Sequence, residues 1–246
     1  MKEENNSLRK ALSVLDLFLI KDFLTIREIM NETGYSKSAV NRIMSTLEST
    51  GYVLRTKEDF QYCLGNKLYF LGEKTNLYRN IVSVCSEEAE KLSMQSGFSV
   101  TMSMREKNMS VTIFKRESHS TMSLVPNVGD HKSLHSSASG KILVAFSEHR
   151  DLIISQIDFI PITEHTITDE QVFRNAIETI RKERVAYDDE ELSPGMFCVA
   201  MPIFSKDQKL LCSISLSGYK PKVMSEMDNV KYLLRQTIQK IENTLN

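Results

Sequence analysis

The sequence predicts an α+β protein of two domains, a helical unit that ends in a β-hairpin and a larger mixed α/β unit. The N-terminal part carries short stretches of helical periodicity followed by strand-like runs, whereas strand-like and helical runs alternate in the remainder. The length of 246 residues also exceeds the size usual for one domain. We place the domains at 1–65 and 81–246, with a linker helix over 66–80.

The composition is that of an ordinary folded chain. Hydrophobic residues make up 41% and the formal net charge is −1, so charge alone does not indicate a nucleic-acid partner. No apolar run approaches the roughly 20 residues that span a bilayer, which predicts a cytoplasmic protein without a membrane partner. The cysteines form no CxxC pair, and we expect free thiols, no metal and no cofactor. These cysteines are Cys63, Cys85, Cys198 and Cys212.

Three helices are predicted before residue 51. Apolar residues recur at helical spacing over 7–18 and mark the first helix. Thr25 and Glu28 have the spacing of a capping box and start the second. Gly34 can adopt the positive φ that ends it, and Ser36 can cap the third helix. The apolar face of this third helix consists of Val40, Ile43, Met44 and Leu47.

The third helix has the two faces that a DNA-recognition helix needs. Residues 52–55 and 61–64 are predicted strands around a polar turn, and this hairpin completes a winged helix-turn-helix. Asn41 can pair with adenine and Arg42 with guanine or a phosphate. A solvated polar helix face is the alternative interpretation. The predicted DNA-contacting residues are Ser36, Lys37, Ser38, Ala39, Asn41, Arg42 and Ser45 in the helix, with Arg55 and Lys57 in the wing.

The second unit is predicted to mix helices and strands. The expected helices are 81–95, 136–146, 169–183 and 224–245, and the expected strands are 99–104, 110–115, 121–125, 187–192, 197–204 and 210–217. Alternation places Cys212 on an apolar face of the last strand and three serines on the opposite face. That second face either meets water or lines a polar cavity, and periodicity leaves both open. Cys198 falls on the less apolar side of its strand.

Segments over nearly the whole chain resemble one known family. In the first unit they are LTIREI at 24–29, GYSKSAVNRI at 34–43, GYV at 51–53 and YCLG at 62–65. In the second they are LHSSASGK at 134–141, DDEE at 188–191, GMFCVAMPIF at 195–204 and SLSG at 215–218. In these segments the chain resembles the IclR family of transcription regulators, with Asn41 at a position where the family commonly has histidine.

The resemblance implies a regulator that binds operator DNA and whose C-terminal domain, GAF-like in fold, binds a small and often acidic effector. The implied effector-contacting residues are Ala138, Ser139, Asp188, Cys198, Ser215 and Ser217. Ser139 stands where the family usually has alanine and adds a hydroxyl, and Asp188 favours a hydroxyl or amine on the ligand, so a hydroxy acid fits. Because one recognition helix reads few base pairs, we expect a homodimer on a palindromic operator, or a dimer of dimers.

Two other functions are alternatives for the second unit. One is a bifunctional DNA-binding enzyme that uses Cys198 and a histidine as a nucleophilic pair. The other is a zinc-dependent sensor that uses Asp188 and Cys198. The sequence contains no GxSxG, no glycine-rich phosphate loop and no HExxH, which argues against the enzyme.

Overall fold

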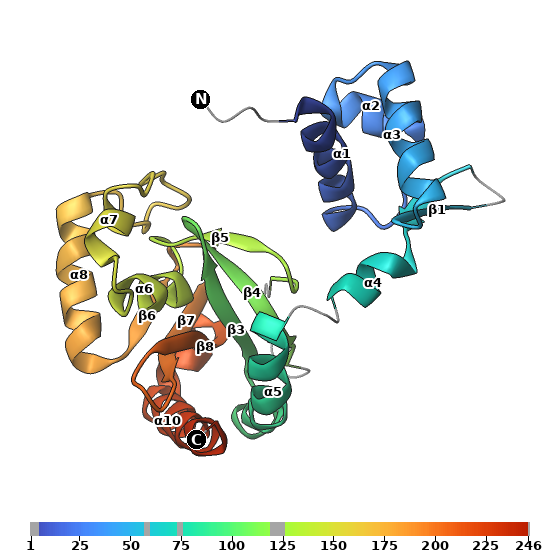
Figure 1. Cartoon of the computed structure of the whole chain (residues 1–246). Helices are drawn as coiled ribbons and strands as arrows, with labels where there is room; N and C mark the ends of the chain where they lie inside the picture. The colour runs from blue at the N-terminus through green and yellow to red at the C-terminus, as the bar shows by residue number, and fades with distance from the viewer. Residues whose placement is uncertain (1–4, 57–59, 73–75, 119–125, 246) are drawn as a thin grey trace. The chain divides into compact units, whose positions relative to one another are not determined.

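The computed structural model of the protein describes residues 5–56, 60–72, 76–118 and 126–245. The chain forms two compact units, Met1–Asn76 and Leu77–Asn246 (Figure 1). Each unit has its own hydrophobic core.

The first unit contains a helix-turn-helix followed by a short hairpin. Its helices are α1 (Asn6–Asp16), a 3-10 turn η1 (Leu17–Leu19), α2 (Ile26–Thr33), α3 (Lys37–Ser49) and α4 (Asn66–Gly72), and its antiparallel strands are β1 (Val53–Arg55) and β2 (Tyr62–Leu64). Thr25 and Glu28 form the predicted capping box. Gly34 ends α2 with φ of +69°, and the Ser36 hydroxyl accepts the Ala39 N–H at the start of α3. These local predictions are confirmed.

The core of the first unit fixes which face of α3 points outward. Val40, Met44 and Leu47 are buried, as predicted from the apolar stripe, and Ile43 is half-buried. The helix therefore presents the opposite, polar face to solvent.

The second unit is built on a six-stranded antiparallel sheet in the order β5-β4-β3-β8-β7-β6. Its strands are β3 (Ser99–Glu106), β4 (Met109–Arg116), β5 (His131–Ser133), β6 (Ala186–Asp189), β7 (Met196–Phe204) and β8 (Leu210–Tyr219). Its helices are α5 (Asn76–Ser96), α6 (Ala138–Ala145), α7 (Arg150–Ile154), α8 (Glu170–Glu183), α9 (Lys220–Ser225) and α10 (Met227–Thr244).

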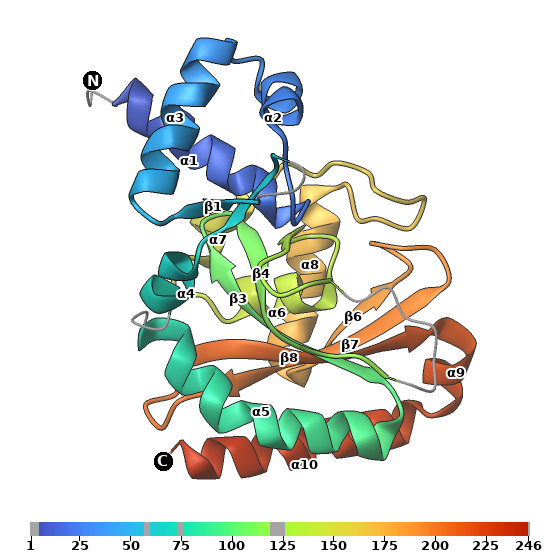
Figure 2. The same cartoon turned by 90° about the vertical axis from the view of Figure 1, so that its right-hand side faces the viewer.

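Helices cover both faces of this sheet (Figures 1 and 2). α5 and α10 pack on one face, where Val100, Ile214 and Leu216 belong to a large apolar cluster. α6, α7 and α8 form the second cluster with Ala186 and Ala200 from the other face. Strand alternation thus separates an apolar face from a face with smaller and more polar side chains.

Three sequence predictions need correction or completion. The strand predicted at 187–192 ends at Asp189, because Glu190 has φ of +60° and starts a turn. The C-terminal helix predicted at 224–245 is divided at Glu226 into α9 and α10. The strand predicted at 121–125 lies outside the described residues.

Candidate nucleic-acid interface and buried polar site

The outward face of α3 carries most of the side chains predicted to contact DNA. Lys37, Ser38, Asn41, Arg42 and Ser45 are exposed on this face. The N–H groups of a first helical turn have no partner within the helix, so a phosphate can be held here. The Ser36 hydroxyl accepts the Ala39 N–H and lies 3.1 Å from the Ser38 hydroxyl.

Arg42 and Ala39 also line a groove between α1 and α3. The groove has a volume of about 410 Å³ and is bordered on the α1 side by Ser7, Leu8, Lys10 and Ala11. Ala39 is half-buried there, and its methyl group offers an apolar surface at the edge of the helix and no polar contact.

In the wing, Arg55 is held against two aromatic rings. Its guanidinium lies 5.1 Å from the centroid of the Phe60 ring and 5.8 Å from that of Tyr62. These cation–π contacts restrict the orientation of an exposed arginine beside the hairpin. Lys57 lies outside the described residues.

The serine-bearing face of β8 is buried. Ser213, Ser215 and Ser217 are all at most 7% exposed, and this face is covered by α6. The Ser215 hydroxyl lies 2.8 Å from that of Thr101 on β3 and accepts a longer hydrogen bond, 3.4 Å, from Ser139 on α6. Of the two alternatives left open by the sequence, an open solvent-facing surface is therefore excluded for these serines.

Strand register brings the remaining predicted effector-contacting residues to the same face. Asp188 on β6 is directly opposite Cys198 on β7, and Cys198 is directly opposite Ser217 on β8. Ala138 and Ser139 start α6, and both are buried. The six residues thus belong to three strands and one helix that meet on one side of the sheet.

Asp188 has a structural role in addition to its place in this group. One carboxylate oxygen, Oδ1, accepts the backbone N–H groups of Glu191 at 2.8 Å and Leu192 at 3.2 Å. This contact closes the turn that ends β6. Burial raises the pKa of Asp188, whereas the charge of Lys141 and the two hydrogen bonds lower it.

Burial also controls the chemistry of Cys198. It raises the pKa of the Cys198 thiol well above its usual value, and the negative charge of Asp188 raises it further. Cys198 is therefore held as a thiol, which is a weak nucleophile.

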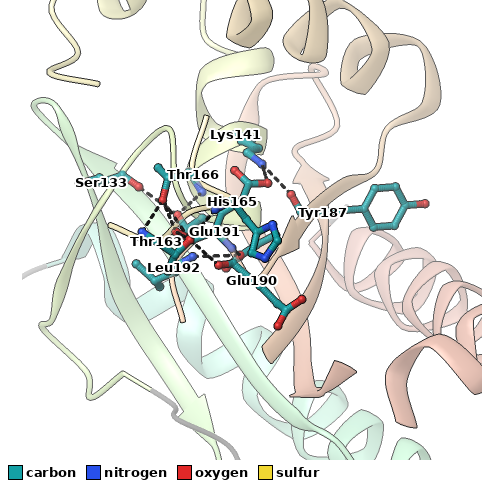
Figure 3. Close-up of polar contacts among 12 residues, drawn as sticks. Ser133, Lys141, Thr163, His165, Thr166, Tyr187, Glu190, Glu191 and Leu192 are labelled. Carbon is teal, nitrogen blue, oxygen red and sulfur yellow. Dashed lines mark hydrogen bonds and ion pairs between the residues drawn. The ribbon is translucent and has the colours of Figure 1, made fainter. Parts of the chain in front are cut away.

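A buried ion pair next to Asp188 was not predicted from the sequence. Lys141 on α6 pairs with Glu191 and donates to the carbonyl oxygen of Tyr187 at 2.9 Å (Figure 3). The hydroxyl of Thr166 donates to the Glu191 carbonyl oxygen at 2.7 Å. These contacts attach α6 and the 163–166 segment to the turn after β6. Lys141 is part of the segment that carried the family resemblance, but nothing in its spacing signals that it is buried.

No three His, Cys, Asp or Glu side chains gather as metal ligands within the described ranges. Likewise, none of the helices in these ranges is both long enough and apolar enough to cross a membrane.

Comparison with known proteins covers both units. The profile of the IclR helix-turn-helix domain matches residues 7–57, and that of the bacterial transcriptional regulator IclR C-terminal domain matches residues 76–243. The chain is 33% identical over 220 residues to the DNA-binding transcriptional repressor YiaJ of Escherichia coli, covering 86% of this chain and 77% of that protein. It is 27% identical to the regulator KdgR of Dickeya chrysanthemi over 91% of this chain and 73% of that protein.

Solved structures show the same fold over the whole chain. The Thermotoga maritima IclR aligns with a TM-score of 0.77 and 28% identity, covering 98% of each chain. An IclR homolog from Microbacterium hydrocarbonoxydans, solved in complex with 4-hydroxybenzoate, aligns with a TM-score of 0.84 and 19% identity over 98% of this chain and 99% of that one. From the two domain matches and the curated relatives together, the chain belongs to the IclR family of DNA-binding transcriptional regulators.

Proposed function

We propose that this protein binds an operator through α3 and its wing, and that a small organic acid bound on the buried polar face of the sheet changes the affinity for that operator. One observation carries the effector part of the proposal. Ser139, Asp188, Ser215 and Ser217 are buried and Cys198 is half-buried, and these residues of one helix and three strands share one face where a soluble domain usually has apolar side chains.

The proposed DNA contacts follow from the orientation of α3. Ser38, Arg42 and Ser45 lie along the centre of its outward face, with Lys37 and Asn41 beside them. Arg42 and Asn41 would contact base edges, Ser36 and Ser38 a phosphate at the helix start, and Arg55 a neighbouring phosphate. A homodimer would place two such helices on a palindromic operator in the cytoplasm.

The proposed effector is a hydroxy acid. The N–H groups of Ala138 and Ser139 in the first turn of α6 and the hydroxyls of Ser139 and Ser217 are donors suited to the oxygen atoms of such a ligand, and the Gly140 N–H already donates to the Ser137 hydroxyl. The second carboxylate oxygen of Asp188 is the acceptor for a ligand hydroxyl, since Oδ1 is already occupied by backbone N–H groups. The 4-hydroxybenzoate bound to the Microbacterium homolog has both groups, which makes it a suitable first probe.

We propose binding without chemical turnover. An enzyme that used Cys198 as its nucleophile would need the thiolate, and burial together with the Asp188 charge opposes its formation. The curated relatives compared above are likewise named as regulators.

The DNA-binding part is tested by measuring fluorescence anisotropy with DNA from upstream of the protein's own gene, at fixed salt. Arg42→Ala is expected to weaken specific binding by about 1 to 3 kcal/mol if Arg42 holds a base. Arg181→Ala removes the same charge from the exposed surface of α8 and serves as the matched control. Equal affinity of the Arg42 and Arg181 variants would remove Arg42 from the interface.

A further inference from the structure

A lysine that the sequence did not single out lies on the buried polar face. Lys132 on β5 is directly opposite Ser110 on β4, and Ser110 shares a strand face with Thr112 two residues later. Thr112 is opposite Ser103 on β3, which is opposite Ser213 on β8. Register therefore directs the Lys132 side chain to the same side of the sheet as the β8 serines.

Lys132 also lies within electrostatic range of the far edge of the sheet. β5 and β6 are the two edge strands, but the charge of Asp188 on β6 acts on Lys132, and that of Lys132 acts on Asp188 and Cys198. The two edges of the sheet thus face a common space on the α6 side. Burial lowers the pKa of the Lys132 ammonium, and the nearby acidic groups oppose this shift.

The other charged groups in this space already have partners. Lys141 is paired with Glu191 and bonded to the Tyr187 carbonyl, and Asp188 Oδ1 accepts two backbone N–H groups. By contrast, no hydrogen bond or ion pair joins the Lys132 side chain to any residue that the structure describes. Lys132 is therefore a half-buried ammonium that can still pair with an anion.

Two hydroxyls in the neighbouring row of the sheet likewise lack a hydrogen-bond partner among the described residues. Their oxygens, Ser103 Oγ and Thr112 Oγ1, are fully buried. A buried hydroxyl without a partner costs free energy, and a polar ligand lying across this row would supply one.

We propose that Lys132 is a specificity-determining residue of the effector pocket, where its ammonium pairs with the carboxylate of the effector and selects an acid over the corresponding neutral amide. The inference rests on the proposed function, because it places Lys132 in the pocket assigned there. A carboxylate at Lys132 and a hydroxyl at Asp188 give a hydroxy acid one orientation between the two sheet edges. A charge-assisted hydrogen bond in a partly desolvated site supplies the discrimination.

The test compares ligands that differ only in charge. Calorimetry at fixed pH and salt would measure a panel of small hydroxy and keto acids, each with its primary amide, starting with 4-hydroxybenzoate and 4-hydroxybenzamide. The wild-type protein is expected to bind at least one acid tenfold or more tightly than its amide. Lys132→Met, which keeps the chain length and removes the charge, is expected to bring the two affinities within about threefold, whereas Lys132→Arg retains the preference.

Folding of these variants is checked by thermal unfolding. Lys132→Met removes a charge whose burial is unfavourable and which has no ion pair among the described residues, so the variant is expected to fold. Lys182→Met, on the exposed surface of α8, controls for the change in net charge.

The outcomes separate this inference from the proposed function. If Lys132→Met keeps the wild-type preference for the acid, or if the wild type binds amides as tightly as acids, the role of Lys132 is overturned while the pocket stands. If no acid or amide of the panel binds, or if Ser217→Ala and Lys132→Met both leave binding unchanged, the pocket itself is misplaced and both proposals fall.

Discussion

The hydroxyl oxygens of Thr101 on β3 and Ser215 on β8 lie 2.8 Å apart within the buried face of the sheet. The two residues are directly opposite each other in the strand register, and Ser139 donates a further hydrogen bond to Ser215 from α6. Ser215 therefore connects two strands and a helix. Ser217, two residues further along β8, has no hydrogen bond to another side chain in the described parts of the chain.

This difference predicts distinct effects for two serine variants. Ser215→Ala leaves the hydroxyls of Thr101 and Ser139 without their partner and is expected to reduce the free energy of unfolding by about 1 to 3 kcal/mol. Ser217→Ala is expected to change stability by less than about 0.5 kcal/mol and to weaken binding of the acid probe roughly tenfold. Thermal unfolding and calorimetry on both variants check these values. A Ser217 variant with unchanged probe affinity would place the ligand elsewhere.

Removing one partner of the Lys141–Glu191 ion pair is predicted to destabilise the second unit more than removing both. Both side chains are less than 10% exposed, so Lys141→Met leaves a buried carboxylate without its cation and is expected to cost about 3 to 5 kcal/mol. The double variant Lys141→Met, Glu191→Leu is expected to recover part of this loss. Lys220→Met breaks the solvent-accessible contacts with Asp189 and Glu190 and is expected to change denaturant unfolding little. Equal effects of Lys141→Met and Lys220→Met would contradict this account.

His135 is predicted to make stability depend on pH. Its ring is fully buried, with Nε2 bonded to the Ile160 carbonyl oxygen at 3.0 Å, and burial lowers the pKa of the imidazole below 6.5. Below about pH 6.5 the unfolded chain takes up a proton at this histidine that the folded chain does not. The free energy of unfolding therefore has its full value above about pH 6.5 and decreases as the pH drops below it. The slope contributed by one such group is at most about 1.4 kcal/mol per pH unit.

The variant His135→Gln keeps a donor for the Ile160 carbonyl oxygen and cannot titrate. Denaturant unfolding between pH 7 and pH 5 is expected to show a flatter loss of stability in this variant than in the wild type. His149→Gln, at an exposed position, is the control and should follow the wild-type slope. The assignment fails if the His135 variant keeps that slope as well.

The four thiols are predicted to differ in reactivity towards a chromogenic disulfide at pH 8. Burial raises the pKa of Cys85 to about 11 and also raises the pKa of Cys198 and Cys212. Cys63 and Cys198 are both half-buried, but the Asp188 charge further opposes the thiolate of Cys198. One thiol per chain should therefore react quickly in the native protein and all four in denaturant. Cys63→Ser should abolish the fast phase. A fast phase that survives in Cys63→Ser would show a reactive thiol in the second unit and would revive the enzyme hypothesis.

Local signals in the sequence predicted most of the fold. The Thr25 and Glu28 capping box, the positive φ of Gly34 and the alternation in β8 depend on neighbouring residues, and the structure confirms them. The end of β6 was missed, because the hydrogen bonds from Glu191 and Leu192 to the Asp188 carboxylate cannot be seen in strand periodicity.

The charged part of the candidate site could not be predicted in the same way. Lysine side chains are mostly exposed in folded proteins. The burial of Lys132 and Lys141 depends on strand pairing and on the packing of α6, which join residues far apart in the sequence. The short strand β5 that carries Lys132 has only three residues, too few for a periodic signal.

The proposed control of operator binding by the buried polar face is tested most directly by titrating upstream DNA with wild-type protein and with Ser217→Ala, at several concentrations of the acid that binds the wild type most tightly. An effector shifts the operator equilibrium only through its different affinity for the two states of the protein. We expect the acid to shift the wild-type midpoint by about fivefold or more, and Ser217→Ala to need roughly tenfold more acid while keeping the acid-free midpoint. The same dependence on acid in both proteins would contradict the account.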